Sequence, residues 1–121
     1  MSYNPFKSTV TDETLVKFLQ EDLNYDLLTV PGIGPAAKNI LEQNHVRNSY
    51  QLLALFLNFI DSQEDNCVSH CGKFYDFLTE IGLKSNRHSI TKSIAEKAAI
   101  FLPLLYQEHQ FSHMEVVNSS V

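Results

Sequence analysis

The sequence predicts an all-α fold, a compact domain of five helices with one glycine turn between two of them. Three observations support this prediction. Apolar residues recur at intervals of three or four positions in several segments, which is the spacing of one helix face. Residues that favour helix caps flank these segments. No segment has the convincing pattern of a strand.

The first half of the chain is expected to contain two full helices. One is Asp12–Leu23, with acidic residues in its first turn, and a short helical piece at 24–29 leads from it into the glycine turn. Pro35 is well placed to begin the second helix, because a helix start leaves its first N–H groups unpaired in any case. This helix should end near Asn44, which tolerates the left-handed conformation of a C-cap.

The third helix is expected to be unusually apolar. Asn48 and Gln51 form a capping box before Ser49–Phe59, and large apolar residues cover most faces of that segment. One side of a helix in a small monomer cannot hide so many of them. The helix must therefore be central in the fold or lie partly at an interface.

Two longer helices complete the domain. Cys67–Ile81 carries one apolar stripe and ends at Gly82 in a Schellman cap. The last helix begins with Ser85 or Asn86 as its cap. It should bend or end near Pro103, because proline cannot continue a regular helix.

Length and composition fit one globular domain. The 121 residues are 44% hydrophobic and 19% charged, which allows a self-sufficient core over residues 1–106. Residues 107–121 lose the helical period and are expected to form a flexible tail. No apolar run approaches the roughly 20 residues needed to cross a membrane. The start of the chain lacks signal or transit features, and Cys67 and Cys71 are interpreted as reduced thiols, so a nuclear or cytoplasmic protein is expected.

The net charge of −5 argues against a nucleic-acid partner, because phosphate binding normally needs a basic surface. The distribution of charge softens that conclusion. Residues 28–60 carry two Lys or Arg against one Glu, and residues 83–106 carry four against one. The candidate anion-binding elements fall in these two segments.

The glycine turn is the sharpest motif of the chain. Gly32 and Gly34 flank Ile33 directly before the helix that Pro35 begins. Glycine permits a positive φ and lets a phosphate approach the main chain, while free N–H groups and the helix dipole attract the anion. Ile33 is expected to point inward between two helices. The alternative is a plain tight turn between packed helices, the usual explanation for an isolated Gly-x-Gly.

The segment Leu27–Pro35 resembles the helix-hairpin-helix motif of DNA repair enzymes and X-family polymerases, with the motif at about residues 24–44. Such hairpins hold the DNA backbone without sequence preference, often with a monovalent cation on the hairpin carbonyls. The resemblance implies that the carbonyls of Leu28, Val30 and Ile33 are the candidate ligands of such a cation. No other cofactor is expected.

A longer resemblance covers roughly residues 27–102 and points to the barrier-to-autointegration factor family. The residues that recur in nearly the same order and spacing are Gly32-Ile33-Gly34, Leu41-Glu42, Tyr50, Leu53, Phe56-Leu57, Phe74, Leu78 and Gly82. This family is small and all-helical, forms homodimers, bridges two DNA duplexes, and binds LEM-domain and chromatin proteins in the nucleus. The resemblance therefore implies double-stranded DNA, a second copy of the chain, and LEM-domain or chromatin proteins as partners.

The family's DNA contacts lie at the glycine turn, the start of the next helix, the N-terminal arm and the start of the last helix. In this chain the matching positions are Gly32, Ile33, Gly34, Ala36, Ala37, Lys38, Lys84, Asn86 and Arg87, with Lys7 as a further candidate. His88 and Lys92 stand beside Lys84 and Arg87, so this segment could grip a second phosphate. An ordinary solvated basic face explains the same residues equally well.

Two other sets of residues suggest chemistry only weakly. Cys67, His70 and Cys71 could meet on one helix face and bind zinc, but a structural site needs a fourth ligand, and cysteine on an apolar stripe is commonly a core residue. Asp76 and Glu80 stand four apart, where carboxylates are more often simply solvated. No catalytic residue and no metal ligand set is expected, and the protein is not expected to be an enzyme.

Two functions remain open from the sequence. The first is a homodimer that binds and bridges double-stranded DNA without sequence preference, in chromatin or nuclear organisation, with Ser49–Phe59 at the dimer interface. The second is a protein-interaction or dimerisation module of the same fold that binds DNA weakly or not at all. The net charge favours the second function, and the glycine turn favours the first.

Overall fold

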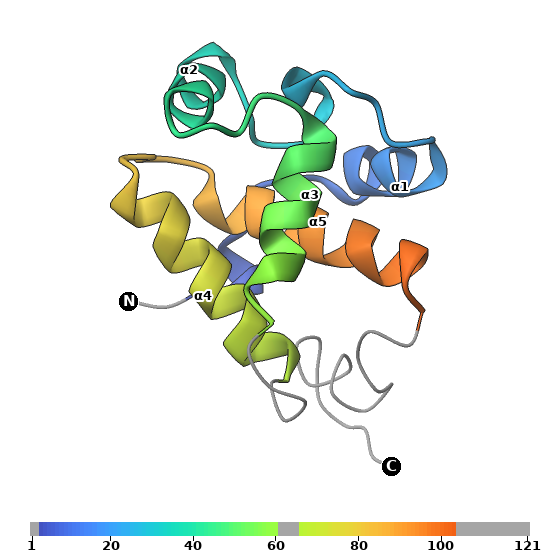
Figure 1. Cartoon of the computed structure of the whole chain (residues 1–121). Helices are drawn as coiled ribbons and strands as arrows, with labels where there is room; N and C mark the ends of the chain where they lie inside the picture. Colours follow the sequence, from blue (N-terminus) through green and yellow to red (C-terminus); the bar gives the residue numbers. More distant parts are fainter. Residues whose placement is uncertain (1–2, 61–65, 104–121) are drawn as a thin grey trace.

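The computed structural model describes residues 3–60 and 66–103, and over these residues the chain is all-helical, with no strand. Within these two ranges, five α-helices and two short 3-10 helices form one compact unit (Figure 1). In chain order they are η1 (Pro5–Lys7), α1 (Asp12–Gln20), η2 (Leu27–Thr29), α2 (Pro35–Gln43), α3 (Ser49–Asn58), α4 (Cys67–Glu80) and α5 (Arg87–Phe101). The predicted all-α fold of five helices is confirmed. The predicted tail at 107–121 lies outside the described residues.

The central helix of the fold is α5. It packs against α1, α3, α4 and η1, and in Figure 1 it runs behind α3. Its buried residues are Ser89, Ile90, Thr91, Ser93, Ile94, Ala95, Lys97 and Ala98. Several of these side chains are small, so neighbouring elements can come close to the helix axis. The large apolar residues of 49–59 predicted a helix that is either central or partly at an interface. In the structure the central helix is α5.

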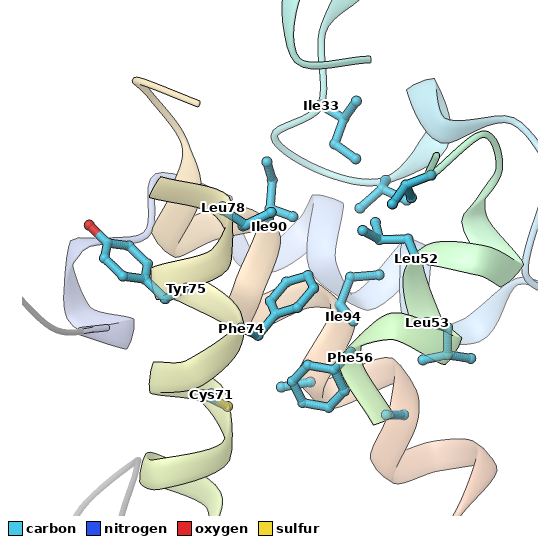
Figure 2. Close-up of a cluster of buried hydrophobic side chains, with 14 of the residues drawn as sticks. Ile33, Leu52, Leu53, Phe56, Cys71, Phe74, Tyr75, Leu78, Ile90 and Ile94 are labelled. Atoms are coloured by element: carbon cyan, nitrogen blue, oxygen red, sulfur yellow. The ribbon is translucent and has the colours of Figure 1, made fainter. Parts of the chain in front are cut away.

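One face of α3 enters the core, and the rest of the helix remains partly exposed. The buried side chains are those of Leu52, Leu53 and Phe56. The ring of Phe56 meets that of Phe74 on α4 edge to face, with 5.3 Å between the centroids (Figure 2). The partly exposed side chains that pack on this core are those of Leu55, Leu57 and Phe59. Most of the apolar surface of α3 is thus accounted for within one chain.

The ends of α2 and α4 share one kind of C-cap. Gly82 follows α4 with a φ of +105°, and the N–H groups of Gly82 and Leu83 donate to carbonyls of the last turn at 3.1 Å each. This is the predicted Schellman cap. After α2, Asn44 is the C-cap residue, as predicted, but its φ is −107°, and the left-handed residue is His45, with a φ of +70°.

The starts of α3 and α5 differ in how they are capped. The Asn48 side chain accepts a hydrogen bond from the Gln51 N–H at 2.9 Å, as predicted. The Gln51 side chain returns one residue earlier than a capping box requires, and accepts from the Arg47 N–H at 2.7 Å. Asn86 precedes α5 in a left-handed conformation, with a φ of +63° and no capping hydrogen bond from its side chain. Asn86 is thus the N-cap residue of the last helix, as predicted, but its side chain makes no capping hydrogen bond.

The end of α1 is capped by a buried lysine. This helix stops at Gln20, three residues before the predicted end at Leu23. Lys97 of α5 is 1% exposed, and its Nζ donates to the carbonyl of Phe18 at 2.6 Å and to that of Glu21. These are carbonyls that a helix end leaves without partners, so the ammonium group takes the place of a C-cap.

Burial lowers the pKa of Lys97, while the carboxylates of Asp22 and Glu21 oppose that shift. The ring of Phe18 lies under the ammonium group, with 5.0 Å from Nζ to the ring centroid. The charge is therefore held by carbonyl oxygens, an aromatic face and nearby carboxylates.

No helix in the described part of the chain is both long and apolar enough to cross a membrane.

Lys97→Met is expected to lower the free energy of unfolding by about 2 kcal/mol, because methionine keeps the volume but leaves the carbonyls at the end of α1 unpaired. Denaturant unfolding followed by circular dichroism measures the change. Lys92→Met is the matched control, since Lys92 lies half-buried on the same helix. The control should change the free energy of unfolding by no more than about 0.5 kcal/mol. Equal losses in both variants would show that Lys97 does not cap α1.

Candidate nucleic-acid interface

The glycine turn is a four-residue β-turn, Val30–Ile33. The Ile33 N–H donates to the Val30 carbonyl at 3.0 Å, and Gly32 has a φ of +96°. Proline at the second position and a positive φ at the third are typical of a type II turn. The chain enters the turn from η2 and leaves it into α2. The element before the turn is therefore one short 3-10 helix, not a full α-helix.

The two glycines of the turn have different surroundings. A Cβ added to Gly32 would lie 2.9 Å from Cγ1 of Ile90 and 3.3 Å from both the Asn86 carbonyl oxygen and Cβ of Ser89. Gly32 is therefore required by its positive φ and by its close packing against the start of α5. Gly34 has a φ of −104°, which any residue can adopt, and nothing lies within 4 Å of the place of its missing Cβ. A positive φ thus occurs at only one of the two glycines.

The missing side chain of Gly34 leaves the start of α2 open. Gly34 is the N-cap residue and offers no side-chain hydrogen bond, so the first N–H groups of the helix, at Ala36 and Ala37, are not capped in this way. Ala36 is exposed and Ala37 is half-buried against the core. Lys38 forms an ion pair with Asp26, with 3.9 Å between Nζ and Oδ1. The start of α2 is therefore open, but the carboxylate of Asp26 offsets part of the positive charge of Lys38.

Ile33 points inward, as predicted. Its side chain is 6% exposed, and Figure 2 shows it reaching toward the buried cluster that includes Leu52 and Ile90. The main chain is therefore the part of Ile33 that remains for a ligand. Among the three carbonyls that the resemblance implies for a cation, that of Val30 already accepts the hydrogen bond of the turn.

The start of α5 carries the second set of predicted residues. Lys84 and Asn86 are exposed. Arg87 lies against α4, where its guanidinium donates to Oγ1 of Thr79 at 2.7 Å and stands 5.1 Å from the ring centroid of Tyr75. Lys84 and Asn86 are thus accessible to a ligand, whereas contacts with α4 hold Arg87 in place.

An N-terminal arm, residues 3–11, lies on the start of α5. The Asn4 N–H donates to Nδ1 of His88 at 3.1 Å, and the Thr9 N–H donates to Oγ of Ser89 at 2.8 Å. Ser89 also borders the glycine turn. The arm, the turn and the start of α5, which the sequence predicted as separate contact segments, therefore meet at one place.

These segments enclose an open depression of about 270 Å³. It is lined by Thr9, Val10, Thr11, Thr14, Pro31, Gly32, Asn86 and Ser89. None of these side chains is acidic, and hydroxyl and main-chain groups are common contacts of phosphate oxygens. A larger cavity of about 420 Å³ lies between α1 and the turn, but Glu21 and Asp22 line it. The smaller depression is the better candidate for an anion.

The basic segment 83–106 offers fewer charges than its composition suggests. Lys97 is buried at the end of α1, so it cannot meet a ligand. Burial, and then the positive charges of Lys7 and Arg87, lower the pKa of His88. The lowered pKa favours the neutral form of His88, so this residue adds little positive charge to the start of α5.

The set of Cys67, His70 and Cys71 belongs to the core. All three side chains are buried, and both cysteines are free thiols. The Nε2 atom of His70 lies 2.5 Å from the Phe56 carbonyl oxygen, and the two rings are stacked. In residues 3–60 and 66–103, no three His, Cys, Asp or Glu residues are placed to hold a metal. Asp76 and Glu80, the two carboxylates considered for acid–base chemistry, lie exposed on α4.

Sequence reasoning missed Ser89 and Thr9, which join the three segments. Neither residue belongs to an apolar period or to a motif. The available signal is the series of small polar residues at Ser89, Thr91 and Ser93, spaced within a helix whose other residues include Ile and Ala. Such a composition indicates a helix with close neighbours on several sides, and it does not identify which residues touch.

Gly32→Ala is expected to lower the free energy of unfolding by about 3 kcal/mol, because the left-handed φ and the overlap with Ile90 both oppose a Cβ. Gly34→Ala should change it by no more than about 0.5 kcal/mol, or raise it slightly, because alanine restricts the unfolded chain. Thermal and denaturant unfolding of the two variants measure the difference. Similar losses in both variants would contradict the different roles assigned to the two glycines.

Comparison with known proteins finds no relative of this chain. No family model, no curated protein and no solved structure matches it. The function of the protein therefore has to be inferred from its own residues and their geometry.

Proposed function

We propose that this protein binds double-stranded DNA without sequence preference, through the main chain at the start of α2 and the surface around the start of α5. The observation that supports the proposal most is the open space at Gly34. The backbone there does not require glycine, and the N–H groups of Ala36 and Ala37 lie uncapped beyond it. A phosphate can approach these groups past Gly34, which has no side chain of its own there, and the dipole of α2 attracts it.

The remaining contacts follow the charges of the described residues. Lys38 and Lys84 supply positive charge near the two helix starts, and the hydroxyl groups of the 270 Å³ depression offer further contacts to phosphate oxygens. Main-chain N–H groups and lysines read only the DNA backbone, so every base sequence is bound alike. The ion pair between Lys38 and Asp26 and the net charge of −5 keep the affinity modest. In this proposal the protein binds DNA and catalyses no reaction.

The resemblance to the barrier-to-autointegration factor family supports the wider parts of the proposal. These are a homodimer that bridges two duplexes, a monovalent cation on the carbonyls of Leu28, Val30 and Ile33, LEM-domain or chromatin proteins as further partners, and a place in the nucleus or cytoplasm. Bridging follows from two-fold symmetry, since each chain supplies one weak grip on a different duplex.

Gly34→Glu is expected to abolish DNA binding and leave the helical content unchanged, because a carboxylate would stand where the phosphate approaches. Gly34→Ala is the control, since it adds volume without charge. Gel shifts with a random duplex and its scrambled counterpart, at several salt concentrations, measure both affinity and sequence preference. Wild-type protein should bind the two duplexes equally, with a log–log salt slope equivalent to about two to four phosphate contacts. Equal affinities of wild type and Gly34→Glu would remove the turn from the mechanism.

A second candidate function is a protein-interaction module. Tyr25 and Tyr50 favour it, since they are 66% and 52% exposed and their ring centroids are 6.1 Å apart. The Tyr50 hydroxyl donates to the Leu23 carbonyl at 2.9 Å, which holds the ring in place. Rigid exposed tyrosines are common at the centres of protein interfaces. Absence of DNA binding by the wild-type protein at low salt would favour this second function.

The bridging part of the proposal predicts a dimer through the exposed side of α3, where Tyr50 and Ala54 lie one turn apart. Phe56 is fully buried, so its substitution would test folding instead. Sedimentation equilibrium at micromolar concentration should give twice the chain mass of 13.8 kDa. Ala54→Arg should give the monomer mass with unchanged helical content. A monomer mass for the wild-type protein would rule out bridging by this dimer.

A further inference from the structure

Ser89 is the meeting point of two segments that are far apart in the sequence. Its side chain is 2% exposed. Its Oγ accepts a hydrogen bond from the Thr9 N–H at 2.8 Å and lies 3.2 Å from the hydroxyl oxygens of both Ser8 and Thr9. On its other side, Cβ of Ser89 is 3.3 Å from the place where Gly32 would carry a Cβ. One small residue of α5 thus touches the arm and the glycine turn together.

His88 supplies a second attachment for the arm. Its Nδ1 accepts from the Asn4 N–H at 3.1 Å, so the proton of the neutral ring is on Nε2, which lies 3.3 Å from the Tyr75 hydroxyl. The ring stacks on Tyr75, with 4.6 Å between centroids, and lies 6.0 Å from the ring of Tyr3. These contacts fix the orientation in which His88 receives the arm.

The attached arm carries Lys7 toward the start of α5. Lys7 is exposed in η1, directly before the two residues that bind Ser89. The positive charges of Lys7 and Arg87 both lower the pKa of His88, after the larger effect of burial. The placement of Lys7 itself follows from geometry, because η1 packs against α5 and Asn4, directly before η1, is bonded to His88 at the start of that helix. An arm released from α5 would lose this arrangement.

We propose that Ser89, with His88 beside it, is a positioning residue that holds the N-terminal arm on α5 and thereby makes Lys7 one of the phosphate contacts. The inference rests on the proposed DNA binding and goes beyond it, because it makes the contact between Lys7 and a phosphate depend on the docking of the arm. Without the hydrogen bonds that hold the arm, Lys7 would lie on a loosely held segment, and each encounter with DNA would cost the entropy of ordering that segment.

The test is a double-variant cycle in which random duplex DNA is titrated over a range of salt concentrations. Lys7→Ala should reduce the log–log salt slope by about 0.9, the value of one phosphate contact. Ser89→Ala should reduce the slope by a similar amount, and the double variant should show no further loss. Additive losses in the double variant, or an unchanged slope in Ser89→Ala, would overturn the proposal.

Ser93→Ala is the matched control. Ser93 lies on the same helix, is fully buried, and its hydroxyl has no hydrogen-bond partner among the described residues. This variant should keep the wild-type slope. If it lost the slope as Ser89→Ala does, the effect would come from disturbing α5 and not from releasing the arm.

A second measurement follows the arm in the protein without DNA. Amide hydrogen exchange, followed by nuclear magnetic resonance, should show protected N–H groups at Asn4 and Thr9 in the wild type. Ser89→Ala should speed exchange at Thr9 by about tenfold or more, while Ser93→Ala leaves it unchanged. Rapid exchange at Thr9 in the wild type would overturn the attachment itself. If the amides are protected but the protein does not bind DNA, the attachment of the arm stands. The phosphate contact of Lys7 and the proposed function are then both refuted.

Discussion

The burial of α5 is the constraint on which the rest of the structure depends. A helix surrounded by α1, α3, α4 and η1 must let each neighbour approach closely, and its residues Ser89, Ser93, Ala95 and Ala98 make that possible. Larger side chains at these positions would push the neighbours outward and open voids between them, at a cost in stability. The core therefore combines large residues from α3 and α4 with a narrow central helix.

The same close approach explains why polar groups lie deep in the fold. Lys97 reaches across from α5 and pairs with carbonyls at the end of α1, and Ser89 receives a main-chain N–H group from the arm. Both of these buried side chains satisfy backbone groups that would otherwise lack a partner. Two side-chain hydroxyls of α5, at Thr91 and Ser93, have no such partner in the described residues. Close packing against neighbouring elements is the role that the structure supports for these two residues.

The packing against α5 also gives the two glycines of the turn different roles. Gly32 is held by its positive φ and by contact with Ile90, so its role in the fold is fully explained. Gly34 has neither constraint, and its missing side chain leaves the start of α2 open. In an acidic protein with few available cations, main-chain N–H groups are the main resource for binding an anion. The proposed function therefore relies on the helix start more than on a basic surface.

The sequence alone predicts the helices, the caps at Asn48 and Gly82 and the inward position of Ile33, because these follow from local spacing and local motifs. It identified the turn and the start of the last helix as candidate contact segments. The folded chain alone shows that α5 is central, that Lys97 is buried, and that the arm meets the turn at Ser89. Hydrophobicity patterns mark large residues, whereas close approach depends on small ones that leave no periodic signal. Contacts between residues some 80 positions apart also depend on how the helices pack, which no local pattern encodes.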